Sequence, residues 1–132
     1  MIVLINLTAE LAKLKTLQGL TPQTTLAKGE GFAPLAPYRD STIFAIKSSG
    51  KTAWERHPDG EEFVQILEGA ATFDLISADG SPQSFEVSAG TIAIVPKGLW
   101  HRARFSHGMT LISVTPTHTE FVKLDVDDPR AA

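Results

Sequence analysis

Cysteine is absent from this chain of 132 residues, and charged residues make up 20% of it. The lack of cysteine excludes disulfides and thiolate metal sites and fits a reducing compartment. The apolar residues 1–5 lack a basic flank and end at Asn6, so they are too short for a secretion signal or a membrane span. We therefore expect a cytoplasmic protein with no membrane partner.

A basic stripe is also lacking. The net charge is -3 and both signs are scattered along the chain, which argues against nucleic acid as a partner. Hydrophobic residues make up 42% of the sequence, enough for a packed core, and the charged fraction is too low for a disordered chain. The length fits one domain.

The first 40 residues predict a short helix and an arm within that domain. After a possible strand at residues 2–5, Thr8 can cap a helix over residues 9–17, whose leucines fall on one face and should lie on a larger body. Residues 21–40 are rich in proline and glycine and are expected to wrap the domain irregularly. We expect residues 41–118 to form a β-barrel and residues 119–132 a C-terminal tail, loose from residue 125 onward.

The middle of the chain has the pattern of short strands separated by turns. About eight such runs suggest an all-β sandwich or barrel. The predicted strands cover residues 42–47, 51–56, 62–67, 70–76, 83–87, 91–95, 100–105 and 110–115.

One short stretch concentrates groups that bind metals. Glu55, His57, Glu61 and Glu62 lie within eight residues. Alternate side chains of a strand share a face, so Glu55 and His57 point the same way, and Glu62 can join them across the turn. With His101 from later in the chain, two imidazoles and two carboxylates would suit a divalent transition metal, namely Mn, Fe, Co, Ni or Zn.

At this point the sequence resembles the cupin superfamily. That family's second motif is matched by Gly90, Pro96, Gly98 and His101 at the expected spacing, and His57, Glu62 and Gly69 fit the end of the first motif. Gly69 selects Glu62 over Glu61 as the inward acid. The resemblance, over about residues 42–115, implies a double-stranded β-helix, or jelly-roll, barrel preceded by the short N-terminal helix and arm.

The same resemblance implies a metal site made of Glu55, His57, Glu62 and His101. Two positions depart from the family pattern: Glu55 stands where a histidine is usual, and Phe105 where an asparagine is common. Glu55 is therefore a candidate metal ligand, a candidate catalytic acid or base, or a solvated partner of Arg56. His101 could also simply hydrogen-bond a loop.

Phe63 and Leu67 occupy the face of their strand opposite Glu62. Apolar residues on that face need cover from the N-terminal helix or a second subunit. Because cupins commonly pair through such faces, we expect a homodimer.

The leading functional hypothesis is a small metal-dependent enzyme, dioxygenase-like or isomerase-like, acting on a small oxygen-rich molecule. The alternatives are a non-enzymatic cupin that binds or senses a small ligand, and a metal-free cupin in which Glu55 replaces ligation. Fold alone does not choose among them.

Overall fold

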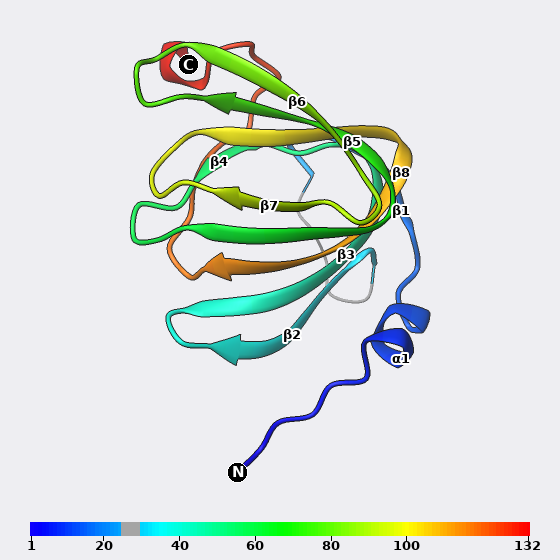
Figure 1. Ribbon diagram of the computed structural model, residues 1–132. Coiled ribbons are helices and arrows are strands. Elements are labelled where there is room, and N and C mark those ends of the chain that lie inside the picture. Colours follow the sequence, from blue (N-terminus) through cyan, green and yellow to red (C-terminus); the bar gives the residue numbers. More distant parts are fainter. Residues whose placement is uncertain (25–29) are drawn as a thin grey trace.

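Strands β1 to β9 make up most of residues 1–24 and 30–132, the part of the chain that the computed structural model describes (Figure 1). One short helix, α1 (Leu7–Ala12), precedes them. The strands are β1 (Leu17–Leu20), β2 (Phe32–Tyr38), β3 (Ser41–Lys51), β4 (Trp54–Arg56), β5 (Glu62–Ile76), β6 (Pro82–Ser88), β7 (Ile92–Val95), β8 (His101–Pro116) and β9 (Glu120–Val122). No helix in these described residues is long and apolar enough to cross a membrane.

Two long antiparallel strands, β5 and β8, form the spine of the barrel. The first part of β5 pairs with the end of β8 (Phe63 opposite Val114), and its last part pairs with the start of β8 (Leu75 opposite His101). The register shifts on either side of Gly69, which has φ +81°. A side chain there would collide with the Gly108 carbonyl oxygen, so both strands can bend together only around glycine. The sequence predicts each strand as two shorter ones, because it does not show that pairing continues through the bend.

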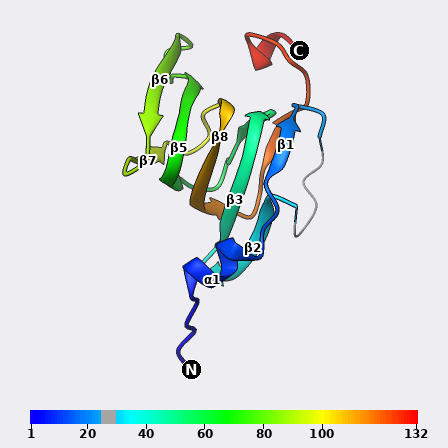
Figure 2. The same ribbon diagram turned by 90° about the vertical axis from the view of Figure 1, so that its right-hand side faces the viewer.

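The remaining strands extend the sheet from this spine and complete a double-stranded β-helix. On one side β3 pairs with β8, while β1 and β2 both pair with β3. Toward the other end of β8, β4 pairs with β8 and with β9. Strands β6 and β7 pair with different parts of β5. The two termini lie at opposite ends of the molecule (Figures 1 and 2).

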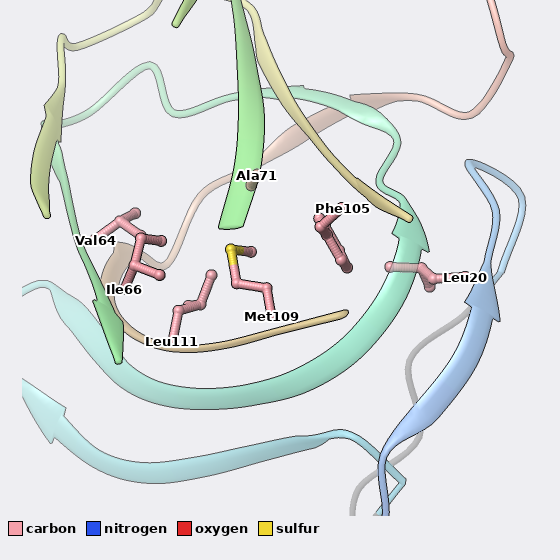
Figure 3. Close-up of a cluster of buried hydrophobic side chains, with 7 residues drawn as sticks. All are labelled: Leu20, Val64, Ile66, Ala71, Phe105, Met109 and Leu111. Atoms are coloured by element: carbon pink, nitrogen blue, oxygen red, sulfur yellow. The ribbon is translucent and has the colours of Figure 1, made fainter. Parts of the chain in front are cut away.

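The core lies between the curved strands. Its buried residues come from β1, β5 and β8 and point into the space between the strands (Figure 3): Leu20, Val64, Ile66, Ala71, Phe105, Met109 and Leu111. Along β5, Glu62, Val64 and Ile66 are buried, whereas Phe63, Gln65 and Leu67 are only partly buried. The predicted alternation is thus confirmed, with Glu62 on the inner face and Phe63 and Leu67 on the outer one.

The N-terminal prediction is wrong in its details. Residues 2–5 form no strand and project from the body (Figure 2). The helix begins at Leu7 because Asn6, rather than Thr8, is its cap: the Asn6 side chain accepts from the backbone N–H of Ala9 at 3.0 Å. It ends at Ala12, and none of its residues is fully buried. Its leucines, Leu7 and Leu11, are nevertheless partly buried, and Leu14 beyond its end is buried, so the predicted leucine face is the side turned toward the body.

The arm is more regular than predicted. Strand β2 pairs with β3 from Phe32 opposite Ile46 to Tyr38 opposite Ser41. Among the described strands β2 pairs only with β3, and prolines such as Pro34 and Pro37 are tolerated in a strand at the edge of a sheet. Residues 25–29 of the predicted arm lie outside the described residues.

The tail is held against the barrel, which corrects the prediction that it is loose. Strand β9 pairs with β4, with Glu55 opposite Phe121. The buried Trp54 donates from Nε1 to the Val126 carbonyl at 2.7 Å, and Lys51 pairs with Asp125 at 2.8 Å. Nothing in the polar composition of the tail shows that Trp54 anchors it.

Candidate metal centre

Four side chains converge at one end of the barrel, and they are the four that the sequence singles out. One ligand-type atom from each of Glu55, His57, Glu62 and His101 lies within 4.8 Å of the others. Glu55 on β4 stands directly opposite His101 on β8, so pairing of these strands places both on the same face. Glu62 is the first residue of β5, and His57 follows β4. Glu61 is exposed and takes no part.

The turns that carry the two motifs are tied to each other. The backbone N–H of Gly98 donates to the His57 carbonyl at 2.9 Å, which joins the turn before β8 to the segment after β4. Gly98 has φ +77°, a left-handed conformation that glycine adopts readily. The conformation of this turn therefore sets the approach of both imidazoles.

The His57 side chain is 2% exposed, and one of its nitrogens has no hydrogen-bond partner among the residues that the structure describes. Nδ1 hydrogen-bonds the Thr119 hydroxyl at 2.9 Å. Nε2 lies 3.6 Å from Oε1 of both Glu55 and Glu62, too far for a hydrogen bond, and finds no other partner among the described residues. A buried nitrogen without a partner is costly unless something else satisfies it.

His101 presents the same nitrogen to the same carboxylates. Its Nδ1 donates to the Leu99 carbonyl at 2.9 Å, so in a neutral imidazole Nε2 carries the lone pair. That atom lies 3.1 Å from Glu62 Oε1 and 3.4 Å from Glu55 Oε1. A lone pair facing carboxylate oxygens at these distances requires a cation between them, either a proton or a metal ion.

The two carboxylates differ in their surroundings. Glu62 is buried, and its Oε2 accepts from the Thr115 hydroxyl at 2.6 Å; Thr115 in turn contacts the Ser113 hydroxyl at 2.8 Å. The Glu55 side chain is 27% exposed. Glu62 is thus fixed on both sides, whereas Glu55 faces the more open part of the site.

The electrostatics of the cluster favour a bound cation. Burial opposes the charged form of both imidazoles, but the nearby Glu55 and Glu62 more than offset it, raising the pKa of His57 to about 9 and that of His101 to about 10. Burial also opposes ionisation of the carboxyls, yet His101 and His57 hold the pKa of Glu55 and Glu62 below the usual value.

The geometry fits a single metal ion in place of those protons. Nitrogen and oxygen ligands about 2.1 Å from one metal stand about 3.0 Å apart at right angles and about 3.4 Å apart at the tetrahedral angle. The measured histidine–glutamate separations are 3.1, 3.4, 3.6 and 3.6 Å. The donor set and the unpartnered His57 Nε2 therefore fit a divalent metal whose identity the geometry leaves open.

Three groups behind the four side chains are absent from the sequence prediction: the Thr119 and Thr115 hydroxyls and the Leu99 carbonyl. Thr115 has a weak signal in the sequence, since it alternates with Ser113 on one face of a predicted strand. Thr119 has none, because its position depends on how the tail returns to β4.

A cavity of about 800 Å³ opens beside the cluster, and Glu55, Glu62 and His101 line one part of it. Phe44, Phe73, Phe105 and Met109 also line it. Its volume is in the range of small-molecule sites.

Comparison with known proteins agrees with this fold. The family model described as "Cupin domain" matches residues 42–115, and the chain belongs to the cupin family. Among curated proteins, none matches the sequence.

Several solved structures are similar. A cupin-2 domain-containing protein from Shewanella frigidimarina has 18% identity and a TM-score of 0.62, with 85% of this chain and 93% of that one covered. A protein from Neisseria meningitidis has 26% identity and a TM-score of 0.58, with coverages of 87% and 100%. A hydroquinone 1,2-dioxygenase in complex with Cd²⁺ and 4-hydroxybenzonitrile has 14% identity and a TM-score of 0.59, with coverages of 70% and 67%.

Proposed function

We propose that Glu55, His57, Glu62 and His101 bind one divalent transition metal ion, and that the protein is a metal-dependent enzyme acting on a small molecule in the adjacent cavity. The observation that carries this proposal is the buried Nε2 of His57, which faces two carboxylates and has no partner among the described residues. A metal ion would satisfy that nitrogen and replace the cation that His101 and Glu62 otherwise require.

The role that we assign to each residue of the cluster follows from how deeply its side chain is buried. His57, Glu62 and His101 are the most enclosed and would hold the ion, with Thr119, the Leu99 carbonyl and Thr115 fixing their orientation. Glu55 is the most exposed of the four and would act either as a fourth ligand or as the group that moves a proton to or from the substrate. The metal would supply Lewis-acid or redox chemistry to a substrate bound through adjacent oxygens.

Two reaction classes remain compatible with these residues. One is oxygenation of a bound diol or dione, as in the structurally similar hydroquinone dioxygenase, whose likeness in itself supports the fold alone. The other is isomerisation, in which a carboxylate such as Glu55 transfers a proton next to a carbonyl group.

Elemental analysis of the purified protein tests the proposal. We expect about one equivalent of a first-row transition metal, falling steeply in His57→Ala but not in His107→Ala, whose exposed imidazole lies away from the cluster. Less than about a tenth of an equivalent in the wild type, even after incubation with Mn²⁺, Fe²⁺, Co²⁺, Ni²⁺ and Zn²⁺, would refute it.

Glu55→Gln then separates the two roles of Glu55. If Glu55 is a metal ligand, the substitution should lower the metal affinity by roughly tenfold or more. If Glu55 is the catalytic acid or base, the substitution should leave the metal content unchanged and abolish turnover.

A metal-free binding protein is the second candidate, and one contact favours it. His101 Nε2 and Glu62 Oε1 are 3.1 Å apart, a distance that a proton on His101 satisfies without any metal. In that case the metal analysis is negative, and the cavity binds a ligand without turnover.

A further inference from the structure

The interior of the barrel beyond the four clustered side chains is apolar. The described residues that line the cavity include Phe44, Phe73, Phe105, Met109 and Leu111. Figure 3 shows Phe105, Met109 and Leu111 projecting from β8 into the space that the curved strands enclose, with Val64 pointing in from β5. A ligand that reached the cluster through this cavity would have its body against aromatic and aliphatic side chains.

Charge in the cavity is mainly negative. Among the described residues that line it, the cations are Arg102, Lys123 and, when protonated, His101. Arg102 is already paired: it donates to Asp74 at 2.8 Å and to the Val126 carbonyl at 3.0 Å, and its guanidinium lies 4.5 Å from the centre of the Trp54 ring.

Lys123 lies over an aromatic ring, with its Nζ 5.5 Å from the centre of Phe121. Phe121 is 52% exposed, so this lysine belongs to the outer part of the cavity. Arg39 and Lys47, which lie in or next to β2 and β3, do not line the cavity. Among the described residues that line the cavity, Arg102 is thus already paired and Lys123 is exposed at the outer part, so the deeper part beside Phe73, Phe105 and Met109 holds no free arginine or lysine for a phosphate or carboxylate.

The metal centre itself would not supply the missing positive charge. Two ionised glutamates cancel the charge of a divalent ion, and two neutral imidazoles add none, so the loaded centre is neutral. Transfer of an anionic group into an apolar cavity beside a neutral centre is strongly unfavourable unless a cation pairs with it.

From these observations we infer that the cavity selects an uncharged, largely apolar molecule that carries two adjacent oxygens at one end. The oxygen pair would face Glu55 and His101, and the apolar body would lie against Phe73, Phe105 and Met109. Sugar phosphates and polycarboxylates are excluded as preferred ligands. This inference rests on the proposed metal function for the oxygen-binding end, whereas the choice of an uncharged apolar body rests on the lumen alone.

A pair of catechols that differ in the charge of one substituent tests the inference. Binding of 4-tert-butylcatechol and of 3,4-dihydroxybenzoate to the metal-loaded protein would be measured by calorimetry near neutral pH. We expect the neutral catechol to bind at least about tenfold more tightly, because the carboxylate of its counterpart would enter a lumen without a partner. Equal binding, or tighter binding of the benzoate, would overturn the inference.

Substitutions locate the binding in the lumen. Ala103 lines the cavity and packs against the core, whereas Ala70 is an exposed residue of β5. Ala103→Leu should weaken the binding of 4-tert-butylcatechol by roughly tenfold and leave the metal content unchanged, whereas Ala70→Leu should not weaken the binding. An Ala103→Leu protein that is folded, metal-loaded and unimpaired in binding would place the ligand elsewhere and refute the inference.

The two proposals fail separately. If the protein takes up no metal, the proposed function fails. The selection of an apolar body is then tested by comparing the affinities of 4-tert-butylphenol and 4-hydroxybenzoate for the metal-free protein. Preference for the neutral phenol would support the inferred selection of an apolar body, and preference for the benzoate would overturn it.

Discussion

Thr119 shows how one hydroxyl outside the cluster can control it. It is the group that contacts His57 Nδ1, and this contact, at 2.9 Å, orients the ring so that Nε2 faces Glu55 and Glu62. Groups in this position usually matter almost as much as the ligands, because they fix both the tautomer and the angle of the imidazole.

We therefore predict that Thr119→Val weakens metal binding by about tenfold to a hundredfold. The valine keeps the shape of the threonine and removes the hydroxyl. Metal affinity would be measured by competition with a chelator, with Thr119→Ser expected to retain most of it. Thr117→Val is the matched control, since the Thr117 hydroxyl donates to the Asp40 carbonyl and contacts no member of the cluster. An unchanged affinity in Thr119→Val would show that His57 needs no such support.

The sequence predicts the four residues of the cluster but not most of the groups that orient them. Glu55, His57, Glu62 and His101 can be selected because strand alternation and motif spacing both act over a few residues. The partner Thr119 cannot, because the pairing of β9 with β4 brings it to its place, and Thr115 has only the weak signal of its alternation with Ser113. Likewise, no local pattern reveals that His57 Nε2 has no hydrogen-bond partner within the described part of the chain.

Among the elements, the bend shared by β5 and β8 is the feature on which the barrel depends. Gly69 has φ +81° and lies against the backbone of Gly108, so a substitution there meets both a strained conformation and a collision with a carbonyl oxygen. Gly90 has a comparable φ of +93° but open space around it.

We predict that Gly69→Ala lowers the free energy of unfolding by about 3 kcal/mol or more, whereas Gly90→Ala lowers it by about 1 kcal/mol. The difference between the two losses of unfolding free energy gives the cost of the collision at the bend, because both variants carry the cost of a positive φ. Urea denaturation of both variants would measure it. Similar losses in the two would mean that the strands can bend without close contact at this point.

The elements also show where local sequence patterns lose their force. The central strands follow from alternation and turn residues, and the sequence predicts them well. The helix starts two residues early because Asn6 competes successfully with Thr8 as the cap. Strand β2, rich in proline, and strand β9, in a polar tail, form because β3 and β4 offer free edges, a tertiary effect that outweighs intrinsic preference.

For the whole molecule, the outer face of the barrel around β5 and β7 remains to be covered. Phe63 stands opposite Ile94 across these strands, and Ile92 and Ile94 are 56% and 53% exposed. The sequence predicts that either the N-terminal helix or a second subunit covers this apolar face. Helix α1 lies away from β5 and β7 (Figure 2), and none of its residues is fully buried. We propose that a second copy of the chain covers this face.

Sedimentation or light scattering would test the homodimer. We predict that Ile94→Lys shifts the monomer–dimer equilibrium toward monomer by roughly thirtyfold or more, since it places a charge in the centre of an apolar contact. Gln83→Lys, on an exposed position of β6, should leave the equilibrium unchanged. A wild-type protein that remains at the monomer mass of 14.2 kDa at high concentration would contradict the proposal.

The continuous pairing of β5 with β8 has a consequence for the order in which the chain folds. Contacts such as Phe63 with Val114 and Leu75 with His101 join segments that are far apart in sequence, so they form only after a large loop has closed. Folding should therefore be slow for a chain of this size, on the millisecond-to-second scale typical of such topologies. During synthesis, Glu55, His57 and Glu62 emerge well before His101 and Thr119, so the supported cluster can assemble only after residues as far as Thr119 have left the ribosome.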